Sequence, residues 1–303
     1  MAVTKQMSTE ALTLRQRWLP VASVLAFVLL LWYGGAVGLN RAGVLERVLP
    51  NSHPNGDYSL LELVDATLNM QRPLLPAPHQ VMADLHDSLT GWPLNSPRNL
   101  AYHLYVTAQS TLVGFALGTL LGMVLAAAIV HSRTLDRALL PWIVASQTVP
   151  VLAIAPIVLV ILGSLGFSGI APKATIAMYL CFFPVTVAMV LGLRAPQRSE
   201  LELLHTYAAS RLQTFWLLRL PAALPYLFPS LRVAIAAGVV GAMVAELPTG
   251  AQAGLGARLL TGSYYGNTVG IWSALVMSAL LGLGLTMAVA GVERLVLRQR
   301  RGA

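Results

Sequence analysis

The sequence has few charged residues for its length. Only 11% of its 303 residues are Asp, Glu, Lys or Arg, whereas a typical soluble domain carries about 25%. Hydrophobic residues make up 56% of the chain, and the mean hydropathy is +0.68. This composition excludes an ordinary soluble domain. The net charge is +8, but the sequence has no concentrated basic module of the kind that binds nucleic acid, so we expect no nucleic-acid partner.

Lysine is also scarce, and its positions exclude one kind of enzyme. Lys5 follows Thr4 and Lys173 follows Pro172, so neither lysine can complete the phosphate-binding motif G-x-x-x-x-G-K-[ST]. The motifs HExxH, CxxC and GxSxG are missing as well. We therefore expect no ATP hydrolysis by that mechanism, no catalytic residues and no cofactor.

Cysteine and clustered metal ligands are similarly rare. Cys181 is the only cysteine, so an intramolecular disulfide is impossible. His79 and His86 lie near acidic residues and could share one face of a helix. Solvated surface side chains are the simpler interpretation, so we expect no metal site.

The sequence does contain long apolar runs. About 20 apolar residues let a helix cross a bilayer core, where backbone polar groups must be satisfied internally. The alternating strands typical of a membrane β-barrel are missing. We therefore predict an all-α polytopic membrane protein with about six transmembrane helices. These are predicted at residues 18–37, 105–130, 140–162, 174–193, 231–247 and 271–289.

The distribution of Lys and Arg predicts the orientation. With six crossings and the N-terminus inside, fourteen Lys and Arg fall on the cytosolic side and six outside, as the positive-inside rule favours. We therefore expect a multi-pass protein of the cell inner (plasma) membrane with both termini cytoplasmic. The predicted parts are a cytosolic N-terminus at 1–17, a first helix at 18–38, a periplasmic segment at 39–99, a core domain at 100–295 with a cytosolic loop at 195–230, and a basic tail at 296–303.

The 39–99 segment is the polar exception. Residues 48–57 have the composition of a turn-rich loop. Residues 59–68 predict a short helix capped by Ser59, and Pro78 can open a second helix that covers 80–89. About 60 residues would form only a marginal core. We therefore expect a linker with interfacial helices, not a ligand-binding domain.

Two features inside the apolar runs predict packing and polarity. Gly114, Gly118 and Gly122 recur every four residues, which lets helices approach closely, either within one chain or in a dimer. Polar groups at membrane depth are costly, so they are functional candidates. We take Gln147, Thr148 and Glu246 as candidates for the translocation path. For Glu246, pairing with Arg258 and extension to the outer interface are alternatives.

The 202–232 segment, between two apolar runs, does not have the composition of a flexible loop. Residues 202–218 alternate apolar and polar side chains at helical spacing, and Leu220-Pro221 is expected to stop this helix. A short amphipathic helix beside a membrane suggests a docking element for a soluble partner.

This segment resembles the EAA loop of ABC-importer permeases, which runs E-A-A, three residues and G, then a hydrophobic-x-L-P. Glu202-Leu203-Leu204 stands at E-A-A, Ala208 at the glycine, and Leu220-Pro221 at L-P. Residues 74–295 are similar to the nitrate/sulfonate/taurine branch of that family. The matching stretches are Leu75-Pro76-Ala77-Pro78, Thr111-Leu112-Val113-Gly114-Phe115, Phe183-Pro184, Val244-Ala245-Glu246 and Gly254-Leu255-Gly256.

The resemblance implies a type I (MetI-like) permease subunit of a binding-protein-dependent transport system, which does no chemistry itself. Its partners would be a second permease copy or sibling, a cytosolic ABC ATPase dimer, a periplasmic substrate-binding protein and the lipid bilayer. Tyr207, Leu212, Phe215 and Trp216 would be apolar anchors for the ATPase. The residues implied in ATPase coupling are Glu202, Tyr207, Ala208, Ala209, Ser210, Arg211, Leu212, Phe215, Leu220 and Pro221.

Two other classes of protein remain as alternatives, and the substrate is open. A secondary transporter or channel would work without an ATPase, and an integral-membrane enzyme would need clustered ionisable groups. The branch handles nitrate, sulfonates and taurine, and its relatives carry pyrimidines or thiamine precursors. Tyr264, Tyr265, Asn267 and Gln252, expected on the outer side, favour a small, polar, flat organic solute.

Overall fold

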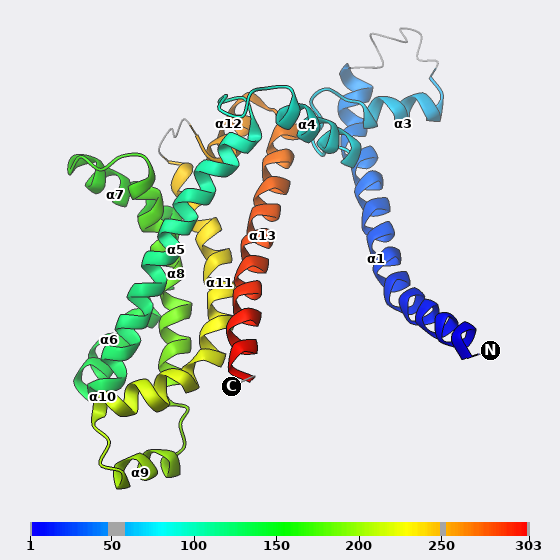
Figure 1. Cartoon of the computed structure of the whole chain (residues 1–303). Helices are drawn as coiled ribbons and strands as arrows, with labels where there is room; N and C mark the ends of the chain where they lie inside the picture. The colour runs from blue at the N-terminus through cyan, green and yellow to red at the C-terminus, as the bar shows by residue number, and fades with distance from the viewer. Residues whose placement is uncertain (1, 48–57, 249–252, 302–303) are drawn as a thin grey trace. The chain divides into compact units, whose positions relative to one another are not determined.

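The computed structural model describes residues 2–47, 58–248 and 253–301 (Figure 1). All regular elements in these ranges are helices, which confirms the all-α class; the predicted loop at 48–57 and Gln252 lie outside the described residues. The helices are α1 (Ala2–Arg47), α3 (Leu60–Leu68), α4 (Pro78–Thr90), α5 (Leu100–His131), α6 (Arg133–Ser146), α7 (Val151–Ser164), α8 (Ile170–Arg194), α9 (Arg198–Thr206), α10 (Arg211–Thr214), the π-helix η1 (Phe215–Arg219), α11 (Leu220–Glu246), α12 (Leu255–Tyr265) and α13 (Thr268–Arg301).

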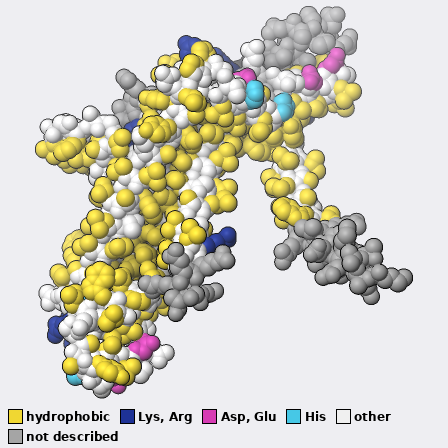
Figure 2. All heavy atoms as spheres, in the orientation of Figure 1, with side chains coloured by type: hydrophobic (Ala, Val, Ile, Leu, Met, Phe, Trp, Pro, Cys, Tyr) yellow, Lys and Arg dark blue, Asp and Glu magenta, His cyan; other side chains and the backbone are white. Residues whose placement is uncertain are grey.

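Five stretches of helix are long and apolar enough to cross a membrane, and a bent pair makes a sixth if it is counted as one span. This agrees with the predicted number of about six. Hydrophobic side chains cover much of the visible surface along these helices (Figure 2). The five are Trp18–Glu46, Leu100–His131, Ile170–Arg194, Arg211–Glu246 and Thr268–Val296.

The predicted span at 140–162 is not one continuous helix. It is divided between α6 and α7, which meet at an angle of 104° across residues 147–150. The break falls at Pro150, which has no amide to donate to the preceding turn and disfavours the helical conformation at Val149. Pro150 instead becomes the N-cap of α7.

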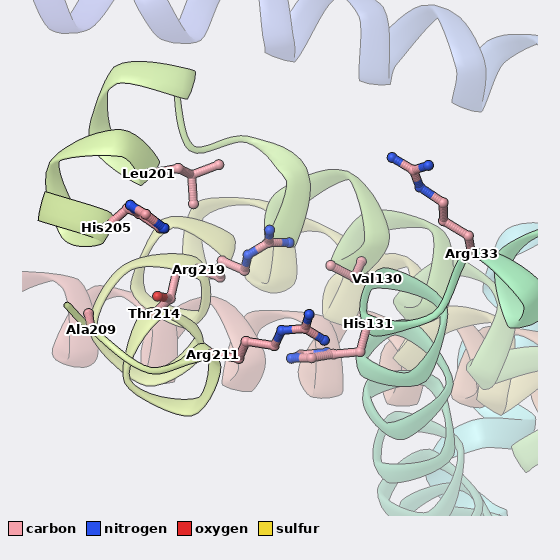
Figure 3. A pocket seen from close by; sticks show the side chains of 9 residues that line it. All are labelled: Val130, His131, Arg133, Leu201, His205, Ala209, Arg211, Thr214 and Arg219. Atoms are coloured by element: carbon pink, nitrogen blue, oxygen red, sulfur yellow. The ribbon is translucent and has the colours of Figure 1, made fainter.

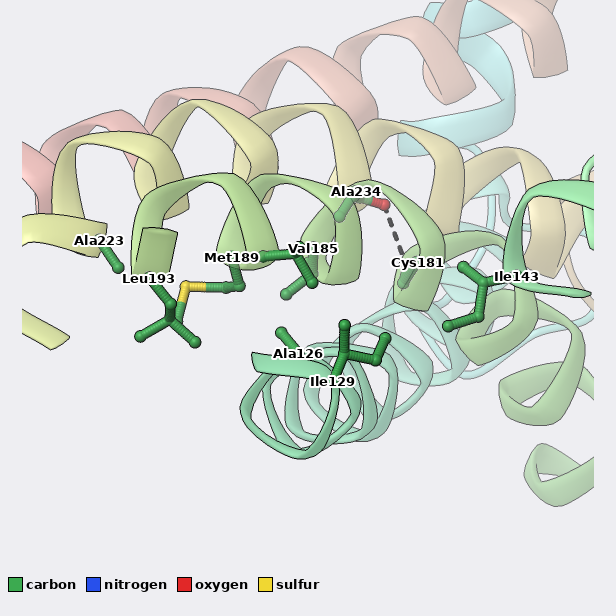
Figure 4. Packing of buried hydrophobic residues seen from close by; sticks show 10 residues of the cluster. Ala126, Ile129, Ile143, Cys181, Val185, Met189, Leu193, Ala223 and Ala234 are labelled. Carbon is green, nitrogen blue, oxygen red and sulfur yellow. Dashed lines mark hydrogen bonds between the residues drawn. The ribbon is translucent and has the colours of Figure 1, made fainter. Parts of the chain in front are cut away.

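The chain divides into two compact units, Met1–Asp87 with Gly262–Ser273, and Ser88–Thr261 with Ala274–Ala303. In the second unit, α5, α8 and α11 pack together. Ile129 of α5 and Met189 and Leu193 of α8 belong to one buried cluster (Figure 4). The thiol of Cys181 donates a hydrogen bond to the backbone oxygen of Ala234, 3.0 Å away. Because lipid is as apolar as these side chains, close packing is what holds the helices together.

The three glycines of α5 allow this close packing. A Cβ added at Gly114 would lie 2.4 Å from the Cβ of Ala177, and one at Gly118 would lie 2.6 Å from the Cβ of Cys181. At Gly122, an added Cβ would meet a backbone oxygen of α8 at 2.8 Å. The structure thus gives the glycine stripe a packing role within one chain, which is one of the two interpretations of the sequence.

In the first unit, the polar segment forms the helices that the sequence predicts. The α1 helix extends to Arg47, past residue 38, where the first helix was predicted to end. The α3 helix begins with a capping box, in which Ser59 caps the backbone of Glu62 and the Glu62 carboxylate accepts from the Ser59 amide at 2.7 Å. Pro78 is the first residue of α4, as expected.

Buried Asn40 of α1 holds the segment before α4 in place. Its Oδ1 accepts from the backbone amide of Leu74 at 2.8 Å, and its Nδ2 donates to the oxygen of Leu75 at 2.9 Å. The indole of Trp32 donates to the oxygen of Pro76 at 3.0 Å and lies 5.0 Å from the ring of Trp272. Residues 74–76 are therefore tied to α1 by specific hydrogen bonds, in contrast to a loose linker.

Candidate coupling segment and candidate translocation path

The 198–221 segment contains two short helices where the sequence predicts one. The α9 helix ends at Thr206, a turn follows, and α10 begins at Arg211. The prediction of a continuous helix over 202–218 is therefore wrong. In the EAA-loop pattern, this break lies after the E-A-A position at Glu202 and before the L-P position at Leu220-Pro221.

The break between α9 and α10 is centred on Ala208. Its φ is +53°, the only positive φ at a non-glycine residue in the described ranges. The amide of Ala208 donates to the oxygen of His205, and the amide of Ala209 donates to the oxygen of Leu204. These two bonds form a Schellman motif, which favours glycine at the left-handed position. The family pattern has glycine here, and an L-residue in this conformation costs about 1–2 kcal/mol.

Ser210 starts the second helix. Its hydroxyl accepts from the amide of Gln213 at 3.3 Å, and the Gln213 side chain accepts from the Ser210 amide at 2.8 Å. This capping box satisfies two amides that would otherwise lack partners. The turn between the helices is therefore fixed by hydrogen bonds on both sides.

Pro221 does not stop the helix, contrary to the sequence prediction. The chain passes from α10 through the π-helix η1 directly into α11, and Pro221 lies in the first turn of α11. The amide of Leu220 donates to the oxygen of Phe215, five residues back. The wider π turn changes the hydrogen-bond register just before the residue that lacks an amide, so the helix continues.

The predicted anchors divide into two groups. Tyr207, Leu212 and Trp216 are 77%, 67% and 58% exposed. Phe215 is half-buried, packs against the core cluster and lies 5.2 Å from the ring of His131. Three of the four anchors are thus available to a partner, while Phe215 joins the segment to the end of α5.

The other predicted coupling residues lie on α9, on α10 and its preceding turn, and at the start of α11. Glu202 pairs with Arg198 at 3.0 Å on the exposed face of α9, where such pairs stabilise little. Ala209 and Arg211 line a cavity behind α10. Leu220 is half-buried against the core cluster, and Pro221 is half-buried beside it in sequence.

The path candidates Gln147 and Thr148 lie in the break between α6 and α7. Both are exposed, and the Thr148 hydroxyl donates to the oxygen of Ala145 at 2.8 Å. The hydroxyl of Tyr179 on α8 donates to the oxygen of Ser146, which the break releases from the helix. The kink therefore presents polar groups between the amphipathic α6 and the strongly apolar α7.

Glu246 differs from the other two candidates because it is fully buried. Its Oε1 lies 3.4 Å from the Nζ of Lys173, which is also buried. Its Oε2 accepts from the amide of Gly256 at 2.8 Å, and the Thr107 hydroxyl donates to both carboxylate oxygens. The alternatives of pairing with Arg258 and of reaching the outer interface are thus replaced by a pair with Lys173.

Three elements meet around this carboxylate. Thr107 also accepts from the amide of Leu255 at 2.9 Å, and Lys173 donates to the oxygen of Ala253 at 2.7 Å. The amide of Gly254 donates to the Nδ1 of His103, which is buried on α5. The carboxylate therefore holds α5, α8 and the 253–256 turn together.

Glycine is required in this turn. Gly254 has a φ of +128°, and a Cβ there would lie 2.1–2.3 Å from the Glu246 carboxylate. There is similarly little room at Gly256, since a Cβ added there would lie 2.3 Å from the Met243 oxygen. Sequence reasoning missed Thr107, Lys173 and His103 in this cluster, although Gly254-Leu255-Gly256 and Glu246 were both singled out.

Comparison with known proteins agrees with these features. Residues 118–301 match the family described as "Binding-protein-dependent transport system inner membrane component". The chain belongs to this family. It is 32% identical over 243 residues to the formylaminopyrimidine transport permease protein ThiX of Halalkalibacterium halodurans, a match that covers 78% of this chain and 90% of ThiX.

Two further relatives have other substrates in their names. The riboflavin transport system permease protein RibX of Chloroflexus aurantiacus is 31% identical, with 68% of this chain and 75% of RibX covered. The taurine transport system permease protein TauC of Escherichia coli is 26% identical, with 76% of this chain and 82% of TauC covered. The chain is therefore an ABC-importer permease of the sulfonate/taurine type, a multi-pass inner-membrane protein.

Family membership also answers the question of protein class. Members are permease subunits, which are not themselves enzymes, and they work with an ATPase and a substrate-binding protein. Family membership therefore favours an ATP-driven importer over a transporter that works without an ATPase. The prediction of an ABC-importer permease is confirmed.

Proposed function

We propose that residues 198–221 couple this permease to a cytosolic ATPase dimer, with both chain termini cytoplasmic. The observation that carries the proposal is the exposure of Tyr207, Leu212 and Trp216 on two short helices. The Ala208 turn and the Ser210 capping box fix those helices. Large apolar side chains on a rigid support are typical anchors of protein interfaces.

The transmission of movement from this segment follows from helix continuity. No loop separates Leu212 from α11, because α10, η1 and α11 follow one another directly. The ring of Phe215 also contacts the end of α5 through His131. Movement of the ATPase against α10 would therefore displace α11.

The translocation path is proposed to lie beside the α6–α7 break. Irregular backbone is tolerated at membrane depth only where it meets protein or a water-filled cavity. The exposed Gln147 and Thr148 meet this condition if a second permease copy covers α6 and α7 and encloses the path between the two copies. Glu246 is proposed to support the wall of the path, because its carboxylate is fully buried.

Co-expression with the candidate ATPase tests the coupling proposal. Tagged permease should copurify with the ATPase, and Leu212→Asp should reduce the amount recovered. ATP-independent uptake by vesicles that contain the permease and no ATPase would contradict the proposal.

The substrate is proposed to be a small, flat, polar organic solute. A cavity of about 630 Å³ at the Lys173 end of α8 is lined by Tyr102, Gln109, Phe167 and Lys173. Aromatic faces, an amide and an ammonium suit a heteroaromatic solute with acceptor groups. The names of ThiX and RibX point to the same class of solute. Tyr264 and Tyr265, which are 79% and 75% exposed, are available to meet the binding protein.

The partner binding protein provides the direct test of the substrate. We expect a formylaminopyrimidine to raise its midpoint of thermal unfolding more than taurine or nitrate does. A larger rise with taurine or nitrate would overturn the substrate class while leaving the coupling proposal intact.

A further inference from the structure

A basic cavity lies behind the proposed coupling segment. Its volume is about 420 Å³, and Figure 3 shows side chains from several elements around it. Arg133 belongs to the start of α6, Arg211 to α10 and Arg219 to η1. His131 from the end of α5 and His205 from α9 complete the nitrogen-bearing side chains.

No carboxylate balances these charges. The lining contains neither Asp nor Glu. Among the described residues, Arg133, Arg211 and Arg219 form no ion pair. Arg219 is half-buried, and its guanidinium donates a long hydrogen bond, 3.5 Å, to the oxygen of Leu193. Like charges that line one cavity without a counter-charge repel each other, and an anion between them reduces that repulsion.

We propose that this cavity binds a phosphate group. Guanidinium groups match phosphate with paired hydrogen bonds, and several can act on its oxygens at once. The cavity is larger than a bare phosphate ion and therefore has room for a phosphate ester. Its position fits this ligand, because α5 and its apolar span end at His131.

Two sources can supply this group, an anionic phospholipid headgroup or a soluble phosphate. A ligand there would connect α10 to the ends of α5 and α6, and so restrict the movement of the coupling segment. The regulatory part of this inference rests on the proposed coupling function. The binding itself does not, because all five basic side chains belong to this chain.

The test uses the purified full-length permease without ATPase, in a neutral detergent at constant ionic strength. One arm titrates inorganic phosphate against chloride, and the other titrates dihexanoyl phosphatidylglycerol against dihexanoyl phosphatidylcholine. Calorimetry gives the affinity, and the midpoint of thermal unfolding gives the stabilisation. The variant is the double substitution Arg211→Gln and Arg219→Gln. Arg198→Gln is the matched control, since Arg198 is 93% exposed and does not line the cavity.

We expect saturable binding of at least one phosphate source. Affinity should fall at least about tenfold in the double variant, because the phosphate would lose two charge-assisted hydrogen-bond donors. Arg198→Gln should bind like the wild type. Binding of phosphatidylglycerol alone assigns the lipid headgroup, and binding of inorganic phosphate assigns a soluble ligand. If the double variant fails to fold, exposed Arg211→Gln alone should weaken binding in the same direction.

Equal affinities in wild type and variants would overturn the proposal, as would the lack of saturable binding in both arms. Since the titrations contain no ATPase, their failure is distinguishable from a failure of the coupling proposal, which copurification tests.

Discussion

Lys173 and Glu246 form an ion pair inside the second unit. The ammonium lies 3.4 Å from the carboxylate, and the two side chains are 10% and 0% exposed. The residues are far apart in sequence, and each also binds the 253–256 turn. The pair therefore joins α8 and the end of α11 to the turn that follows α11.

Removing one member of this pair should destabilise the protein strongly. Glu246→Gln leaves a buried ammonium without its counter-charge, so we expect a loss of about 3–5 kcal/mol in the free energy of unfolding. The double substitution Lys173→Met and Glu246→Gln should cost less than the sum of the single changes. Denaturant unfolding in detergent measures both. The control is Arg194→Gln, because the Arg194–Asp136 pair is 44% and 30% exposed and should contribute at most about 1 kcal/mol. Equal losses for Glu246→Gln and the control would contradict a buried pair.

A methyl group at Gly254 should break the same cluster. Gly254→Ala places a Cβ within 2.3 Å of the Glu246 carboxylate at a φ of +128°, so the turn cannot keep its position. We expect a larger fall in the unfolding midpoint than for Gly166→Ala. Gly166 has a φ of +82° and open space around it, so its substitution adds backbone strain alone. If both variants melt at the same temperature, contact with the Glu246 carboxylate contributes nothing to the fall in the unfolding midpoint.

Glycine at position 208 should stabilise the coupling segment. Ala208→Gly removes the strain of a positive φ, and we expect a gain of about 0.5–1 kcal/mol after the entropy of the unfolded chain is counted. Ala208→Val should destabilise the turn and lower ATPase-coupled uptake. Local hydrogen exchange over 198–214 is the measurement, with Ala209→Gly as the control that should not gain stability. Faster exchange in Ala208→Gly than in the wild type would contradict the left-handed turn.

A charge on the exposed face of α10 should separate ATP hydrolysis from transport. Leu212 is 67% exposed, so Leu212→Asp should leave folding unchanged and weaken contact with the ATPase. We expect ATPase activity in the complex to lose its dependence on substrate-loaded binding protein. The control is Leu61→Asp, since Leu61 is 82% exposed on α3. Normal coupled uptake by Leu212→Asp would count against α10 as the docking helix.

Hydropathy predicted the spans well because about 20 apolar residues have few alternatives in a bilayer. The caps at Ser59 and Pro78 were also predictable, since both act through neighbours in sequence. The break in the helix at Pro150 was less predictable. Proline is tolerated in membrane helices as well as at kinks, and the sequence does not determine which of the two occurs.

The coupling segment shows a second limit of sequence reasoning. The periodicity of 202–218 fits a helix, but the chain turns at Ala208 because two backbone bonds close a Schellman motif there. Pro221 is the opposite case, where a helix-breaking residue is absorbed by the π turn before it. Both outcomes depend on hydrogen-bond register, which side-chain patterns do not encode. The Lys173–Glu246 pair was not predictable for another reason, because only the packing of α8 brings the two residues together.

The π-helix sets the rotation between α10 and α11. A π turn contains one residue more than the α turns on either side, and one residue corresponds to a rotation of about 100° around the helix axis. Conversion of Phe215–Arg219 to α geometry would therefore turn the face that carries Leu212 by that amount while α11 stays fixed. The π turn therefore fixes the direction in which the face carrying Leu212 points relative to α11.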